Sequence, residues 1–174
     1  MTVKKILTEP NEILRKKSEP VDQVNEDIKK IMDDMLETMY AAPGIGLAAI
    51  QIGIPKRVIV IDISSKEEPK KPIFFINPEI TNKSDNNSTY EEGCLSVPGQ
   101  FAEIDRPEKC YVKYLDYNGE QQEIKAEGML ATCIQHEMDH LEGILFIDYL
   151  SKLKKSMIIK KLSKQKKAIE RIVV

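Results

Sequence analysis

The two histidines of this 174-residue chain lie four residues apart, within His136-Glu137-Met138-Asp139-His140. On an α-helix this spacing places both imidazoles on one face, one turn apart, where they can bind one metal ion. The Glu137 carboxylate can then reach a water molecule on that metal, as in the HExxH motif of metal-assisted hydrolysis. The alternative is a solvated helix with two incidental histidines. It is disfavoured because the chain has no histidine elsewhere.

A catalytic metal site needs a third protein ligand and keeps a fourth position for water. The candidates are a downstream carboxylate and the three cysteines. Cys110 falls within an alternating strand pattern, and Cys133 already lies on the helix, three residues before His136. Cys94 follows Gly93 in an irregular segment rich in turn-forming residues, which can shape the backbone around a ligand. The residues therefore favour a Cys-His-His site that includes Cys94.

A second candidate segment is the glycine-rich stretch 44–53, which is apolar except for Gln51. Taken alone, it favours a glycine-rich turn that leads into a strand. The alternative is a substrate-binding segment. In that case the glycines would let a substrate backbone approach closely, and Gln51 would direct its amide into an apolar pocket.

Hydrophobic periodicity predicts the helices that position these residues. The histidine-bearing helix should run over about 129–142 and end at Gly143 as its C′ residue. An earlier helix should begin after Asn25 as N-cap and run to about residue 40. A last helix should cover about 153–172.

The strand pattern is weaker. Residues 57–63 and 73–76 read as strands, the second ending at Asn77-Pro78. Residues 109–116 and 121–125 should form a hairpin around Asn118-Gly119. We interpret 82–88 and 91–99 as turns and 144–150 as an extended segment.

Composition predicts one soluble globular domain over residues 1–174, with no repeat or linker that would divide it. Residues 150–174 carry nine Lys/Arg and one Glu, a formal charge of +8, and the remainder carries −10. This basic C-terminal helix suggests an interaction arm. Three cysteines do not form a disulfide framework and fit a reducing compartment. The N-terminus has neither a signal-peptide core nor a transit pattern, and no apolar run reaches membrane-spanning length. We expect a cytoplasmic protein that has no membrane partner.

Three separated segments together resemble the signature motifs of the bacterial peptide deformylases, in order and in approximate spacing. They are Gly44-Ile45-Gly46-Leu47-Ala48-Ala49-Ile50-Gln51, Glu92-Gly93-Cys94-Leu95-Ser96 and Gln135-His136-Glu137-Met138-Asp139-His140. The resemblance covers about nine tenths of the chain, from Ile13-Leu14-Arg15 to Phe146-Ile147-Asp148-Tyr149-Leu150. The form of the cysteine motif resembles the shorter, Gram-negative-like subtype.

The resemblance implies removal of the N-formyl group from the N-terminal formylmethionine of newly synthesised proteins, with release of formate. Cys94, His136 and His140 would bind one divalent metal ion. Metal-bound water would attack the formyl carbonyl, with Glu137 as general base and then general acid. By resemblance the metal is Fe(II), with zinc, nickel or cobalt as substitutes, although these ligands also suit zinc.

The resemblance also assigns roles to the surrounding residues, and it favours the substrate-binding interpretation of segment 44–53. Gln51 and the backbone N–H of Leu95 would stabilise the oxyanion. Glu92 and Arg106 would form a pair that supports the cysteine turn. Substrate-binding residues would be Ile45, Gly46, Met129, Thr132 and Cys133, where Thr132 makes the methionine pocket more polar than an aliphatic residue would.

For the fold, the resemblance implies an α+β chain. Short antiparallel β-sheets should wrap around the central HExxH helix, with an N-terminal and a C-terminal helix. The basic helix 150–174 resembles the one with which deformylases approach the ribosome, and a merely solvated lysine-rich helix is the alternative. We expect a monomer that acts on nascent N-formylmethionyl polypeptides.

Two other functions are consistent with parts of the pattern. A zincin protease shares HExxH but takes a later His or Glu as third ligand. Here Glu142 is too close on the same helix, and Glu170 lies in the basic segment. A catalytically silent metal-binding module that docks on ribosomes would have no need of Glu137 or Gln51, so the presence of both disfavours it.

Overall fold

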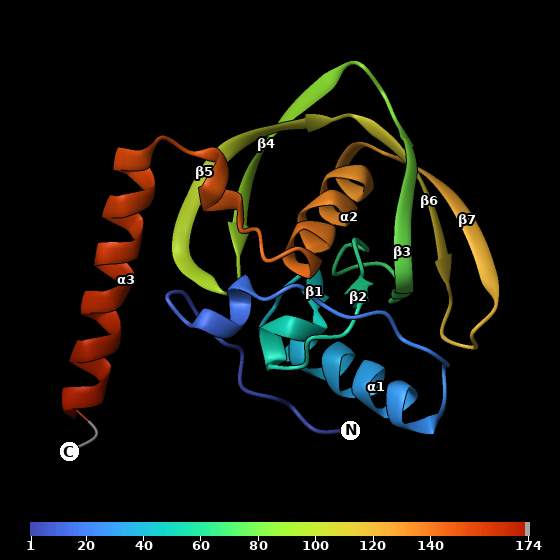
Figure 1. The fold of residues 1–174 in the computed structure, drawn as a ribbon, viewed down its shortest axis with the longest axis horizontal. Helices are drawn as coiled ribbons and strands as arrows, with labels where there is room; N and C mark the ends of the chain where they lie inside the picture. The colour runs from blue at the N-terminus through green and yellow to red at the C-terminus, as the bar shows by residue number, and fades with distance from the viewer. Residues whose placement is uncertain (173–174) are drawn as a thin grey trace.

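A central helix surrounded by antiparallel sheets organises the fold. The computed structural model describes residues 1–172. Helix α2 (Gly128–Leu141) carries both histidines and lies between two sheets (Figure 1). One sheet has five strands in the order β1-β2-β3-β6-β7, and the other is the two-stranded pair β4-β5. This is the α+β architecture that the resemblance predicted, although β3 and β5 are eleven residues long rather than short.

The remaining elements follow in chain order. They are η1 (Glu12–Arg15), α1 (Glu26–Ala41), β1 (Gly46–Ala48), η2 (Ala49–Ile52), β2 (Val58–Ile61), β3 (Ile73–Lys83), β4 (Asn87–Cys94), β5 (Val97–Pro107), β6 (Lys109–Leu115), β7 (Gln121–Glu127), η3 (Phe146–Tyr149) and α3 (Lys152–Ile172). The elements labelled η are short 3-10 helices.

Strand β2 shows how the five-stranded sheet is buried on both faces. Its four residues are all apolar and fully buried. Ile59 and Ile61 join the cluster that packs against α2, whereas Val58 and Val60 join the cluster that packs against α1. Because successive side chains of a strand point to opposite faces, a continuous apolar run is what such a strand requires.

Helix α1 confirms the prediction made from its cap and its methionines. The Asn25 side chain accepts a hydrogen bond of 3.0 Å from the Ile28 backbone N–H, which satisfies one free donor of the first turn. Met32, Met35 and Met39 are fully buried in the cluster shared with β2. These methionines therefore stabilise the core.

The end of α2 is held by the N-terminal segment. Gly143 adopts a left-handed φ of 74° after the helix, as expected of a C′ residue. A Cβ at this position would lie 2.4 Å from the Arg15 carbonyl oxygen, so the two backbones are in close contact. The Arg15 guanidinium donates to the Asp148 carboxylate at 2.6 Å, and the Ser18 N–H donates to the Leu141 carbonyl at 2.8 Å.

Several strand predictions were wrong. Strand β3 does not end at Asn77-Pro78 but continues to Lys83, with register shifts along its pairing with β6. Asn77 has a φ of 50°, and its side chain bonds the N–H and C=O of Val21 at 2.8 Å, so tertiary contacts hold a conformation that we interpreted as a strand end. The turn predicted over 82–88 is confined to residues 84–86, because β3 ends at Lys83 and β4 begins at Asn87, and 146–149 form η3 rather than an extended segment.

Helix α3 lies at one side of the molecule, beside η3 and β5 (Figure 1). Leu162 is buried against Val97 and Ile104 of β5, together with Phe146 of η3. Most of the other α3 side chains are exposed, including the lysines of its second half. Within residues 1–172, no helix combines the length and apolar character that a membrane span requires.

Candidate metal centre and active site

Three potential metal ligands converge from two elements. Cys94 is the last residue of β4, and His136 and His140 lie one turn apart on α2. One ligand atom from each lies within 4.8 Å of the others, and Cys94 Sγ is 3.4 Å from His140 Nε2. The two imidazoles are 9% and 1% exposed, and Cys94 is half-buried. The structure thus brings together the three ligands that the motifs predicted.

The β4–β5 hairpin positions Cys94. Gly93 pairs with Phe101, but the next pair is Cys94 with Val97, so the register shifts and a two-residue turn follows the cysteine. A Cβ on Gly93 would lie 2.5 Å from the Phe101 ring, which shows why glycine occupies this position. Our interpretation of 91–99 as a turn was therefore only partly right, since Cys94 ends β4 and the turn is confined to residues 95–96.

The chemistry of the donor set fits one divalent metal ion. A thiolate and two imidazoles are a common ligand combination for zinc and other transition metals, and three protein ligands leave a position open. Burial holds the pKa of His140 well below its usual range, so its imidazole is neutral, the form that binds a metal. For His136, burial also lowers the pKa, but hydrogen bonds with Cys94 and Glu92 outweigh it and hold the pKa well above its usual range. The carboxylate of Glu137, next to His136 in the chain, has one buried oxygen, Oε2, with no hydrogen-bond partner within residues 1–172.

Glu92 orients the first histidine. Its Oε1 is 2.8 Å from His136 Nδ1, so the other ring nitrogen is left for the metal. Arg106 donates to both oxygens of Glu92, from Nε at 2.7 Å and from Nη2 at 3.0 Å. Burial alone would raise the pKa of the Glu92 carboxyl, but the hydrogen bonds from His136 and Arg106 outweigh it, and the pKa is lowered. The predicted Glu92–Arg106 pair is present and charged.

The network behind this pair includes two residues that sequence reasoning missed. Arg106 Nη1 also donates to Asp139 at 2.8 Å, and the Tyr149 hydroxyl donates to the same Asp139 oxygen at 2.7 Å. The guanidinium of Arg106 stacks 5.0 Å from the centre of the Tyr149 ring. The position of Asp139 between the histidines was an available signal. Tyr149 gave none, because its contact depends on how η3 folds back.

Glu137 lies inside the cavity next to Gly46. Burial raises the pKa of its carboxyl to about 7, in the range where a group can both accept and donate a proton near neutrality. A Cβ on Gly46 would lie 2.4 Å from Glu137 Oε1. Gly46 lines the cavity as expected, and it also makes room for the Glu137 carboxylate.

Gln51 points its amide nitrogen toward the cysteine. It lies in η2, directly after β1, and is 1% exposed. The Ala48 N–H fixes the side-chain oxygen at 2.9 Å, so that Nε2 donates to Ser96 Oγ at 3.0 Å and is directed at Cys94 Sγ, 3.6 Å away. Ser96 was not predicted from the sequence. Its hydroxyl, on the second residue of the β4–β5 turn, orients the Gln51 amide.

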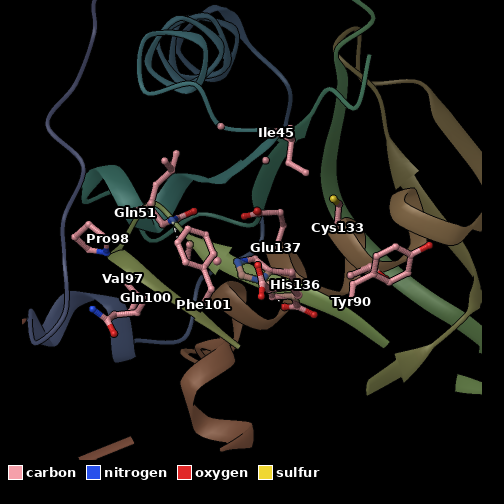
Figure 2. Close-up of a pocket in the computed structure, with 18 of the residues that line it drawn as sticks. Ile45, Gln51, Tyr90, Val97, Pro98, Gln100, Phe101, Cys133, His136 and Glu137 are labelled. Carbon is pink, nitrogen blue, oxygen red and sulfur yellow. Dashed lines mark hydrogen bonds and ion pairs between the residues drawn. The ribbon is translucent and has the colours of Figure 1, made fainter. Parts of the chain in front are cut away.

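These groups open onto one cavity of about 500 Å³ (Figure 2). In Figure 2, Glu137 lies between Gln51 on one side and Cys133 and Tyr90 on the other. The five residues predicted to bind substrate all line this cavity: Ile45, Gly46, Met129, Thr132 and Cys133. Leu95, in the turn after Cys94, lines it as well. The structure therefore places a potential metal centre, a buried carboxylate and an apolar pocket side by side.

Comparison with known proteins identifies the family. Residues 3–156 match the family described as polypeptide deformylase. The peptide deformylase of Pelagibacter ubique is 70% identical over 174 residues, which cover 100% of each chain. The chain belongs to the polypeptide deformylase family. The family predicted from the three motifs is thus confirmed.

Solved deformylase structures share the fold. The crystal structure of peptide deformylase from Ehrlichia chaffeensis superposes with a TM-score of 0.92 at 44% identity, covering 96% of this chain and 98% of that one. The class I type b deformylase of Acinetobacter baumannii, solved with Met-Ala-Ser bound, has a TM-score of 0.80 at 34% identity, covering 86% and 99%. The family match ends at residue 156, so most of α3 lies beyond it.

Proposed function

We propose that this chain catalyses the reaction of the deformylase family, the hydrolytic removal of the N-formyl group from the formylmethionine of newly synthesised polypeptides. The observation that carries the proposal is the buried Glu137 carboxylate, with one unpartnered oxygen, beside the Cys94-His136-His140 set. The tripeptide in the Acinetobacter baumannii structure is what would remain of formyl-Met-Ala-Ser after loss of formate.

Cys94, His136 and His140 would hold one divalent metal ion. When bound, the ion would supply Lewis-acid polarisation and lower the pKa of a coordinated water from 15.7 to about 7. We infer Fe(II) from the resemblance to the family, with zinc, nickel or cobalt as substitutes, whereas ligand chemistry alone would also suit zinc.

Glu137 would move the protons of the reaction. Its carboxylate would take a proton from the attacking water and deliver one to the nitrogen of the leaving methionine, so that formate and a free amine result. Burial supports this role, because it places the pKa of the carboxyl at about 7. Because Gly46 has no side chain, it leaves the space that the Glu137 carboxylate occupies.

Gln51 and Leu95 would stabilise the negative charge that develops on the formyl oxygen. The Gln51 amide is held by Ala48 and Ser96 and is directed at Cys94, so it needs little reorganisation during the reaction. The backbone N–H of Leu95 follows the cysteine directly and would be the second donor. Loss of one such donor typically costs about 3 kcal/mol in the barrier.

The apolar part of the cavity would accept the methionine side chain. Met129, Thr132 and Cys133 form its wall on α2, over the two turns before His136. Burial, reinforced by the charge of Glu137, raises the pKa of the Cys133 thiol to about 12, so Cys133 contributes a neutral surface. Ile45 and Gly46 line the cavity from the β1 side and would contact the peptide backbone.

We further propose a cytoplasmic monomer whose α3 contacts the ribosome. The exposed lysines of α3 support this, because basic groups bind nucleic-acid phosphates in a salt-dependent manner. Since Leu162 is part of the core, the lysines should be changed rather than the helix removed. Charge reversal of Lys164, Lys166 and Lys167 should weaken ribosome co-sedimentation and leave tripeptide turnover intact. Unchanged co-sedimentation would exclude this interface.

The proposed activity can be tested by formate release from formyl-Met-Ala-Ser, with protein purified without oxygen. The parent should release formate, and Glu137→Gln should lower kcat by about a thousandfold while metal content stays unchanged. Glu142→Gln is a matched control, because Glu142 is paired with Arg57 outside the cavity. No release by the metal-loaded parent would overturn the proposed function.

A further inference from the structure

Two buried threonines on helices differ in how their hydroxyls are satisfied. Thr38 of α1 donates to the Asp34 carbonyl four residues earlier, at 2.6 Å, which is the usual bond of a helical threonine. Thr132 of α2 is 6% exposed, yet its hydroxyl has no hydrogen-bond partner within residues 1–172. A buried hydroxyl without a partner costs free energy, so a partner that enters with a ligand would be favoured.

The position of Thr132 indicates which ligand atom would be that partner. Met129, Thr132, Cys133 and His136 follow helical spacing and line the same cavity. Thr132 precedes His136 by one turn, about 5.4 Å along the axis. The proposed function places the formyl group at the metal ligands and the first side chain of the substrate against Met129, Thr132 and Cys133. A methionine sulfur, three bonds from its Cα, then comes level with Thr132.

The Thr132 hydroxyl can turn toward such an atom. In the structure the oxygen itself is fully buried, so the side chain must rotate to present it to the cavity. Helical threonines use two χ1 rotamers, and a rotation about one bond moves the hydroxyl relative to the methyl group. The neighbouring side chains on this face of α2 do not compete with it as donors. Met129 has no donor, and the thiol of Cys133 is a weak one.

We propose that the Thr132 hydroxyl donates a hydrogen bond to the sulfur-bearing side chain of the first substrate residue. The pocket would then recognise the heteroatom as well as the length of the side chain. Norleucine, which has a methylene in place of sulfur, would leave the hydroxyl unpartnered. Methionine sulfoxide, whose S=O oxygen is a stronger acceptor than a thioether, would gain more from the same donor. The inference rests on the proposed function for the placement of the substrate.

The test compares side chains rather than absolute rates. We would measure kcat/KM for formyl-Met-Ala-Ser and for the peptides with norleucine or methionine sulfoxide in first position. The parent should prefer methionine over norleucine by about threefold, within the range of one neutral hydrogen bond. Thr132→Val keeps the shape and removes the donor, so this ratio should fall to about one. In the same variant, the ratio of kcat/KM for the sulfoxide peptide to that for the norleucine peptide should fall about tenfold from its value in the parent.

Two further variants separate hydrogen bonding from packing. Thr132→Ser keeps the donor and should keep both ratios near those of the parent. Met129→Leu reshapes the same wall without touching the hydroxyl and should change methionine and norleucine substrates by the same factor. The proposal is overturned if Thr132→Val leaves the ratios as in the parent, or if Thr132→Ser loses them as Thr132→Val does.

A binding measurement distinguishes this inference from the proposed function. Calorimetry with Met-Ala-Ser and its norleucine counterpart reports the same preference without turnover. A parent that binds Met-Ala-Ser more tightly by about threefold, with the difference lost in Thr132→Val, supports the inference even if no formate is released. Equal affinities in the parent would overturn it, whether or not the enzyme is active.

Discussion

The two sides of the candidate metal centre satisfy their polar groups in opposite ways. Behind His136, the side chains of Glu92, Arg106, Asp139 and Tyr149 bond one another in a continuous network. On the cavity side, Glu137 Oε2 and Thr132 Oγ1 are buried, and neither finds a hydrogen-bond partner within residues 1–172. Helix α2 contributes to both sides. The groups that orient His136 are saturated, whereas Glu137 and Thr132 on the cavity side keep hydrogen-bonding capacity for a ligand.

Replacing a candidate metal ligand should have the largest effect, because both metal content and turnover should be lost. Cys94→Ser exchanges a thiolate donor for a hydroxyl, so the purified protein should lose its metal, and kcat/KM should fall by at least about a thousandfold. Metal analysis and formate release measure the two effects. Cys110→Ala is the control, since Cys110 is buried in β6 and is not among the residues that line the cavity. A Cys94→Ser protein with full metal content would instead indicate a ligand set like that of a zincin.

A change on the cavity side should lower turnover and leave the metal in place. In Gly46→Ala the new methyl group would meet Glu137 Oε1, and the carboxylate would have to move. Displacement of a catalytic group by about 1 Å can cost about a hundredfold, so kcat should fall by that order. Metal content should equal that of the parent. A variant with parental kcat would show that Glu137 tolerates the shift.

A change in the network behind His136 should instead weaken metal affinity and leave kcat largely unchanged. Arg106→Ala removes the donors that hold Glu92 and Asp139, and loss of such outer contacts typically weakens metal affinity about 10- to 100-fold. Competition with a chelator measures this affinity, and fully metal-loaded protein should keep most of its kcat. Tyr149→Phe removes one bond of the same network and should show a smaller loss. Metal affinity unchanged in Arg106→Ala would mean that Glu92 needs no support.

The sequence predicted the parts of the molecule in which one helix or one motif carries the information. Helix α2, its Gly143 terminus and the two histidines could be identified because their spacing is local, and Cys94 could be identified from its own motif. The β4–β5 hairpin could not, because most of β4 is exposed or half-buried and shows no apolar alternation. The outer half of β3 was missed for the same reason, and Asn77-Pro78 suggested an end that its contacts with Val21 override.

The hydrogen-bond network of Arg106, Asp139 and Tyr149 could not be predicted from the sequence, for a different reason. Asp139 meets Arg106 across 33 residues, and Tyr149 reaches Asp139 only because η3 folds back onto α2. Ser96 likewise contacts Gln51 across 45 residues. No local pattern encodes such pairs. They follow from the assembled topology of two sheets and a helix.

The docking of the N-terminal segment on the end of α2 has a consequence for how the site forms. The hydrogen bonds from Arg15 to Gly143 and Asp148 join positions 128 and 133 residues apart. Contacts of such sequence separation require closure of a long loop and are gained late in folding. During synthesis, residues 1–18 leave the ribosome well before their partners exist. The contacts of Arg15 that stabilise the end of α2, next to His140, can therefore form only when nearly the whole chain has emerged.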